Sequence, residues 1–274
     1  MATDTFEFKP ASRLSRTLAG GSDFFFKLLR IAAFYVGLIV VWQLVADSGL
    51  WESYAFAGPT EVWDSLQQNW DNGRIQDAVQ TSLKRLAIGF AFAFIIGITM
   101  GAAMGGLKWV DETVGSLAVG MQSLPSVTWL PLALIWYGLS ERAIIFVVVM
   151  GSVFAISISA RDGVRNIPPL FRRAGLTFGA NHYQMLRYVV MPGMIPSMVQ
   201  GLKLGWSFAW RSLMAAELLY VSGGLGFLLQ LGRDLNNISQ VMAVMVVIIA
   251  IGLTVDRVIF ARLEGWVKER WGLA

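Results

Sequence analysis

Long apolar runs with few charges recur along the chain and constrain its fold more than any other feature. Runs such as Leu28 to Ala46 and Val241 to Phe260 are long enough to cross a lipid bilayer as helices. With 55% hydrophobic and 15% charged residues, the composition is not that of a soluble domain of 274 residues. The sequence therefore predicts an all-α integral membrane protein.

Six transmembrane helices are expected. They cover about residues 28–46, 86–107, 114–137, 143–159, 195–219 and 241–260. We assign residues 1–27 to a cytoplasmic N-terminal tail, 28–260 to the transmembrane domain and 261–274 to a cytoplasmic C-terminal tail.

The distribution of basic residues predicts the orientation of these helices. With the N-terminus inside, fifteen Lys and Arg residues fall on the inner side and five on the outer side. Cytoplasmic loops carry the excess of basic residues, so both termini are expected inside. Lys84 and Arg85 form the one discordant pair on the outer side.

The second predicted span carries a stripe of small residues. They stand at successive four-residue steps: Gly89, Ala93, Gly97, Gly101 and Gly105. Such a stripe lets another helix approach closely, so we expect a packing role.

The third predicted span contains two prolines, Pro125 and Pro131, and we expect both to break it. Broken helices are tolerated where they border protein or an aqueous path. Gln122, Ser123 and Trp129 are therefore candidates for a translocation pathway, and a plain kinked span is the alternative.

The fifth predicted span carries three charged residues, Lys203, Arg211 and Glu217, which are costly in lipid unless they face protein or water. Lys203, Trp210 and Glu217 share one helix face, but Lys203 and Glu217 are about 21 Å apart along the axis and cannot pair directly. These residues either form a polar path for an anion or brace neighbouring helices, and the sequence leaves both interpretations open.

A polar segment between the fourth and fifth spans, from Pro168 to Pro192, has the pattern of two short helices. The first is expected to begin at its prolines and to end at Gly179, where a left-handed cap suits glycine. Asn181 and Gln184 form a variant of the capping box for the second helix, which Pro192 is expected to end. We call residues 168–192 the elbow.

The elbow resembles the signature loop of the membrane subunits of ATP-binding-cassette (ABC) importers. That loop has Glu-Ala-Ala, three residues, Gly, nine residues and then Ile-x-Leu-Pro. Here Arg173-Ala174-Gly175 occupy the first positions, Gly179 follows, and Val189-Val190-Met191-Pro192 come last with the spacing intact. The acidic first position of the family is replaced by Arg173.

Three further stretches resemble the nitrate, sulfonate, taurine and bicarbonate branch of that family. They are residues 56–62, residues 81–85 with Gly89, and residues 209–219, and the whole resemblance covers roughly Trp51 to Arg262.

This resemblance implies a type I ABC importer-like permease with a cytoplasmic elbow. Its implied partners are a second copy of the chain, cytoplasmic ATPase subunits that bind ATP and Mg, and an external substrate-binding protein. The implied cargo is a small oxoanion such as nitrate, bicarbonate, a sulfonate or taurine, and the implied location is the bacterial cytoplasmic membrane. The implied ATPase-coupling residues are Arg172, Arg173, Ala174, Gly175, Gly179, Ala180, Asn181 and His182.

The chain itself is not expected to be an enzyme or to bind nucleic acid. Gly223-Gly224-Leu225-Gly226 reads as a turn and lacks the context of a phosphate-binding loop, so another subunit must hold ATP. The absence of cysteine and the single histidine, His182, exclude cysteine-ligated and multi-histidine metal sites. Two rival hypotheses are a secondary transporter in which Glu217 carries a coupling proton, and a membrane scaffold without a substrate.

Overall fold

The computed structural model describes residues 13–49, 55–219 and 223–272, and all regular structure in these ranges is helical. The first twelve residues of the predicted N-terminal tail, and Trp51 at the start of the family resemblance, lie outside the described residues. The chain divides into two compact units, residues 1–62 and 63–274.

The first unit is dominated by α1 (Arg13–Asp47), which begins within the predicted tail. Its apolar stretch, Leu28–Asp47, buries no side chain within the structure, as suits a helix that faces lipid or another chain. The indole Nε1 of Trp42 donates a 3.0 Å hydrogen bond to the carbonyl of Ala57, just before α2 (Pro59–Asp71).

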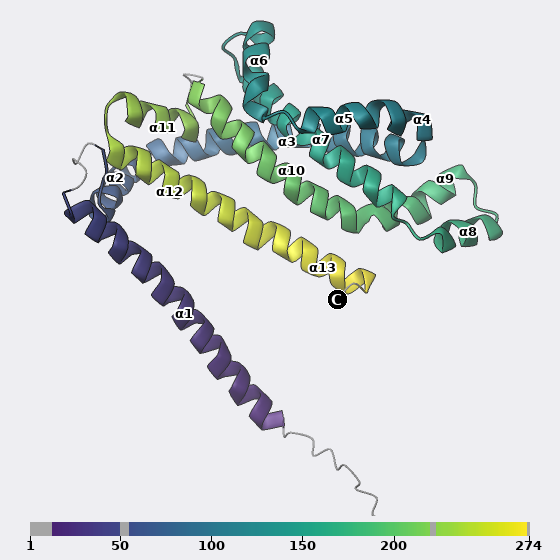
Figure 1. Ribbon diagram of the computed structural model, residues 1–274, viewed down its shortest axis with the longest axis horizontal. Helices are drawn as coiled ribbons and strands as arrows, with labels where there is room; N and C mark the ends of the chain where they lie inside the picture. The colour runs from purple at the N-terminus through teal and green to yellow at the C-terminus, as the bar shows by residue number, and fades with distance from the viewer. Residues whose placement is uncertain (1–12, 50–54, 220–222, 273–274) are drawn as a thin grey trace, which may run out of the picture. The chain divides into compact units, whose positions relative to one another are not determined.

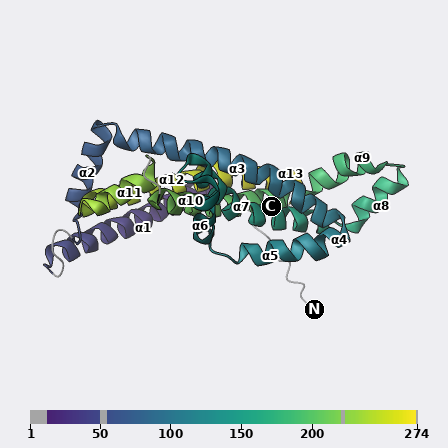
Figure 2. The ribbon, with the colours of Figure 1, turned by 90° about the horizontal axis from the view of Figure 1, so that it is seen from above.

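The centre of the second unit is formed by α3 (Arg74–Gly106), α7 (Glu141–Arg165) and α10 (Met191–Leu219). In this unit α7 packs extensively against both other helices (Figure 1), and α3 lies along it in the second view (Figure 2). Leu86, Val147 and Leu213, one from each helix, are fully buried in the shared core. The predicted second, fourth and fifth spans thus form one packed layer.

The small-residue stripe of α3 packs against α7 of the same chain. A Cβ atom added at Gly97 would lie 2.8 Å from Cγ2 of Ile156. One added at Gly101 would collide with the carbonyl oxygen of Ser157 and lie 2.6 Å from Cβ of Ala160. A second helix approaches this stripe closely, as expected, and that helix is α7 of the same chain.

The third predicted span consists of two parts that meet at 104°. The first part comprises α4 (Lys108–Val110), a π-helical turn (Asp111–Gly115) and α5 (Ser116–Gln122). The second part comprises a 3₁₀ turn (Ser126–Trp129) and α6 (Leu130–Tyr137). Pro125 lies at the bend, as expected. The expected break at Pro131 is wrong, because Pro131 is the second residue of α6, where no N–H donor is needed.

The second helix of the elbow continues into α10 instead of ending at Pro192 as expected. α9 (His182–Met185) continues through a π-helical turn (Leu186–Val190) directly into α10, which contains Pro192. The N–H of Met191 bonds to the carbonyl of Leu186, five residues back. Proline normally clashes with the carbonyl four residues before it, and the wider π turn relieves this crowding. The prediction that Pro192 ends the helix is therefore wrong.

Two helices, α2 and α11 (Leu225–Asp234), were not predicted from the sequence, and α3 begins twelve residues before the predicted second span. Gly223 and Gly224 form the predicted turn, with φ of 69° and 101°, but α11 starts at the next residue and includes Gly226. It is followed by α12 (Ile238–Thr254), a π-helical turn (Val255–Phe260) and α13 (Ala261–Trp271), which form one uninterrupted helix.

Four helices in the described ranges are long and apolar enough to cross a membrane, and the bent pair makes a fifth if it counts as one span. α10 is not among them. The count of six spans stays a prediction.

Candidate functional site

The elbow is built around a tight turn at the end of α8 (Pro169–Thr177). The N–H of Ala180 bonds to the carbonyl of Gly175 and that of Gly179 to the carbonyl of Leu176, both at 3.0 Å. This pair of bonds is the Schellman motif, which needs a left-handed residue after the helix. Gly179 supplies it with a φ of 74°, so the predicted cap is confirmed.

The second helix of the elbow begins with the predicted capping box. The side chain of Asn181 accepts a 2.8 Å bond from the N–H of Gln184, whose side-chain oxygen accepts a 2.9 Å bond from the N–H of Asn181. Two backbone donors at the start of α9 are thereby satisfied.

The two halves of the elbow are held to each other and to the end of α7. A Cβ atom added at Gly175 would lie 2.9 Å from Cε of Met185, so the helices pack closely there. Arg172 donates a 2.6 Å bond from Nη2 to the carbonyl of Val164 in α7. Beside these contacts lies a cavity of about 450 Å³ whose lining includes Arg172, Asn181 and His182. Ala174 is half-buried, whereas Arg173 is exposed.

Exposed apolar side chains cover the elbow, a feature that the sequence interpretation missed. Phe178 at the tip of the turn is 89% exposed. The other large exposed apolar residues of the elbow are Leu170, Phe171, Leu176, Tyr183, Leu186, Tyr188 and Met191. Several large exposed apolar side chains on one short segment are typical of a protein–protein contact.

A charged cluster braces the segment before the elbow. Asp111 in the π-helical turn pairs with Arg165 at 2.6 Å and with Arg161 at 3.5 Å, both from α7. This contact could not be predicted from the sequence, because Asp111 and its two arginine partners are separated by about fifty residues.

The charged residues of α10 have separate partners. The ammonium of Lys203 lies 3.2 Å from carboxylate oxygens of Asp256 and of Glu264 in the last long helix. Arg211 is exposed, with Nε donating to the carbonyl of Ser207 at 3.1 Å and its guanidinium 5.3 Å from the ring centre of Phe208.

The Glu217 side chain is fully buried, and its carboxylate accepts hydrogen bonds from three donors. Oε2 accepts bonds from Ser82 Oγ at 2.7 Å and from the N–H of Gly226 at 3.1 Å, and Oε1 pairs with Arg85 at 3.1 Å. The second guanidinium nitrogen of Arg85 lies 3.3 Å from Glu141. Arg85, which the basic-residue count placed on the outer side against the general trend, is thus the partner of the buried Glu217 carboxylate.

The remaining pathway candidates lie in two places. Trp210 is buried and stacks on Trp206, with ring centres 6.3 Å apart. Gln122 and the exposed Ser123 lie at the bend, and Trp129 packs edge-on against Phe146. In the described part of the chain, no hydrogen bond or ion pair joins the candidates at the bend to the charged residues of α10.

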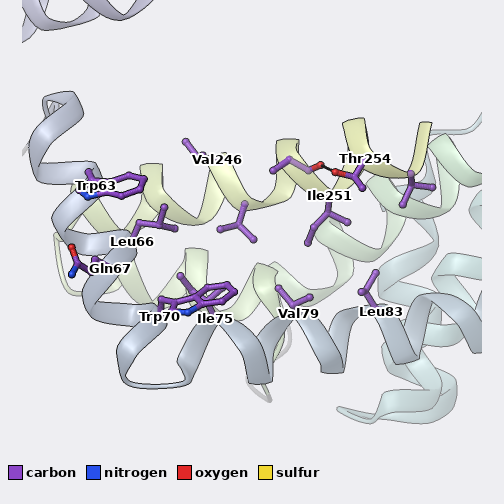
Figure 3. Close-up of a pocket in the computed structure, with 13 residues that line it drawn as sticks. Trp63, Leu66, Gln67, Trp70, Ile75, Val79, Leu83, Val246, Ile251 and Thr254 are labelled. Carbon is purple, nitrogen blue, oxygen red and sulfur yellow. Dashed lines mark hydrogen bonds between the residues drawn. The ribbon is translucent and has the colours of Figure 1, made fainter. Parts of the chain in front are cut away.

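An apolar groove of about 670 Å³ lies between α2, α3 and α12 (Figure 3). Its labelled lining includes Trp63, Leu66, Trp70, Ile75, Val79, Leu83, Val246 and Ile251, with only Gln67 and Thr254 as polar residues. An oxoanion would lose its hydration there without gaining a charged partner, so the groove is no candidate for the pathway.

Comparison with known proteins decides the family. Residues 93–269 match the binding-protein-dependent transport system inner membrane components. The chain belongs to this family. It is an ABC transporter permease, a membrane-spanning transport component, and the predicted family is confirmed.

Known relatives include permeases of the nitrate, sulfonate, taurine and bicarbonate branch. A putative ABC transporter permease of Methanocaldococcus jannaschii is 36% identical, with 68% of this chain and 70% of that protein covered. The taurine transport permease TauC of Escherichia coli is 28% identical, with 85% and 87% covered. The nitrate import permease NrtB of Synechocystis is 26% identical over the same shares.

Solved structures confirm the predicted fold, that of type I ABC importer permeases. An inward-facing structure of the MetNI methionine ABC transporter has a TM-score of 0.61 at 20% identity, covering 69% of the permease and 94% of the solved chain. An amino acid ABC transporter has a TM-score of 0.59 at 16% identity, with 75% and 97% covered.

Proposed function

We propose that the permease imports a small oxoanion, such as nitrate, bicarbonate, a sulfonate or taurine, by coupling to cytoplasmic ATPase subunits through the elbow. The supporting observation is the elbow itself, which combines a rigid capped turn with an exposed apolar surface and continues into α10. A movement imposed on the elbow would pass into the membrane domain without crossing a flexible joint.

Two copies of the permease would pair in the bacterial cytoplasmic membrane, each elbow docked on an ATPase that holds ATP and Mg. An external binding protein would deliver the anion. Arg172, with its bond to α7, would hold the elbow in place, while the exposed Arg173 and His182 would face the ATPase.

The proton-coupled alternative gains no support from the site of Glu217. A proton carrier must exchange with water on both sides, whereas this carboxylate is enclosed by Ser82, Arg85 and the N–H of Gly226. We therefore propose a bracing role for Glu217.

Reconstitution tests the function directly. The permease, its co-expressed ATPase and the binding protein are placed in liposomes, and uptake of labelled taurine, nitrate, bicarbonate and an alkanesulfonate is measured with and without ATP. We expect ATP-dependent uptake of one of these anions. Uptake by the permease alone, driven by a proton gradient, would contradict the proposal.

A further inference from the structure

Two stretches that carry the family resemblance meet in the second unit. Ser82 and Arg85 belong to the stretch 81–85 of α3, and Glu217 belongs to the stretch 209–219 of α10. They are more than 130 residues apart in the sequence, yet both α3 side chains contact the same carboxylate. We call Ser82, Arg85, Glu217 and the backbone of residues 223–226 the Glu217 cluster.

The Glu217 cluster also holds the turn before α11. Arg85 Nη1 donates a 2.9 Å bond to the carbonyl of Gly223, and the N–H of Leu225 donates a 2.9 Å bond to Ser82 Oγ. Ser82 thus accepts from α11 and donates to Glu217, so a single hydroxyl links all three helices.

Close packing leaves the turn little freedom beside the carboxylate. A Cβ atom added at Gly224 would lie 2.5 Å from Oε1 of Glu217, and one added at Gly226 would lie 2.5 Å from its Cβ. Only glycine fits at these two positions. The backbone of the turn rests directly on the Glu217 side chain.

The charge balance requires the cluster to stay together. Separating a buried acid from its basic partner leaves an uncompensated charge in a low-dielectric interior, which is strongly unfavourable. The carboxylate is fully buried and the Arg85 side chain is only 4% exposed, so neither charge has water as an alternative partner. Opening the cluster during each transport cycle would incur this cost every time.

We propose that Glu217 is a positioning residue that joins α3, the end of α10 and the start of α11 into one body that stays intact through the transport cycle. This inference rests on the proposed function, in which movement of the elbow enters α10. The Glu217 cluster then passes that movement to α3 and to the turn before α11 together.

Hydrogen–deuterium exchange of the complex with its co-expressed ATPase tests this inference. We compare the peptide covering residues 223–234 in the wild type, in Glu217→Gln and in Glu141→Gln. Glu141 is a matched control because it also contacts Arg85, but its side chain is 63% exposed and, among the described residues, it forms no hydrogen bond or ion pair with the turn. Glu217→Gln should speed exchange of this peptide about tenfold or more, and Glu141→Gln about twofold or less.

Two further measurements separate positioning from simple folding. Trapping the wild-type complex with ATP and vanadate should change exchange in the elbow and leave residues 223–234 unchanged. Glu217→Gln should retain ATP hydrolysis while losing about tenfold or more of its uptake, because docking at the elbow is intact. Ser82→Ala, a smaller change, should show the same pattern if Glu217→Gln fails to fold.

Faster exchange of residues 223–234 in the trapped wild type would overturn the single-body inference. Equal exchange in Glu217→Gln, Ser82→Ala and the wild type would overturn the positioning role. If no ATPase associates, the proposed function fails, while the comparison of variants in the purified chain still decides whether Glu217 holds the turn.

Discussion

Gly179 is the residue of the elbow whose backbone admits the fewest replacements. A Cβ atom at Gly179 would meet no other atom, so the penalty of a substitution comes from its φ of 74° alone. We expect Gly179→Val to weaken association with the ATPase, or to uncouple ATP hydrolysis from uptake at least tenfold. A β-branched residue is less stable in this left-handed backbone conformation by about 1–3 kcal/mol, so the turn would change shape. Co-purification and coupled uptake assays measure both effects.

Gly265→Val is the matched control. Gly265 lies in α13, where an added Cβ atom also meets nothing within 4 Å and φ is not positive. It should behave as the wild type. Full coupling in Gly179→Val would contradict the role given to the turn.

Arg211 is the one basic residue of α10 without a carboxylate partner among the described residues, and its side chain is exposed. If its guanidinium serves a passing anion, Arg211→Ala should lower uptake severalfold while the amount of ATPase bound stays unchanged. Lys203→Ala provides the contrast, because it leaves Asp256 and Glu264 without their cation and should reduce the folded yield. Loss of assembly in Arg211→Ala would favour a bracing role instead.

At the level of helices, the α3–α7 contact depends on the glycines of α3. Gly101→Leu should lower the thermal stability of the purified permease by the equivalent of about 2–3 kcal/mol or more, because its side chain meets the backbone of Ser157. Gly106→Leu is the control on the same helix, since nothing lies within 4 Å of an added Cβ atom there. Equal melting temperatures for both variants would show that α7 can move aside.

The sequence predicted the long apolar helices and the caps at Gly179 and Asn181, because apolar length and the conformational preferences of these two residues act locally. It missed contacts between distant residues, such as Arg85 with Glu217, since charge spacing along one helix cannot identify a partner on another. It also placed a helix end at Pro192, because nothing in the local pattern indicated the π turn that accommodates this proline. The short helix α11 was hidden for a related reason, since its ten residues cannot span a membrane.

For the whole molecule, the predicted orientation places the elbow inside and the loop between α2 and α3 outside. The chain has no cysteine, so introduced cysteines are unique labelling sites. In intact cells a membrane-impermeant maleimide should label Asn72→Cys and spare Thr177→Cys, although both positions are exposed in the structure. Labelling of Thr177→Cys from outside would invert the topology and remove the elbow from the ATPase.

The unbroken junction between the elbow and α10 has a mechanical consequence. With 29 residues, α10 is a rod about 43 Å long, so a shift of one helical pitch, about 5.4 Å, at the elbow end corresponds to a tilt of about 7°. Because Glu217 near the far end of α10 is bonded to Ser82 and Arg85 of α3, a tilt of α10 is transmitted to α3 at that end. α10 therefore cannot tilt alone: α3 must tilt with it, and the close-packed contact between α3 and α7 must carry the same movement.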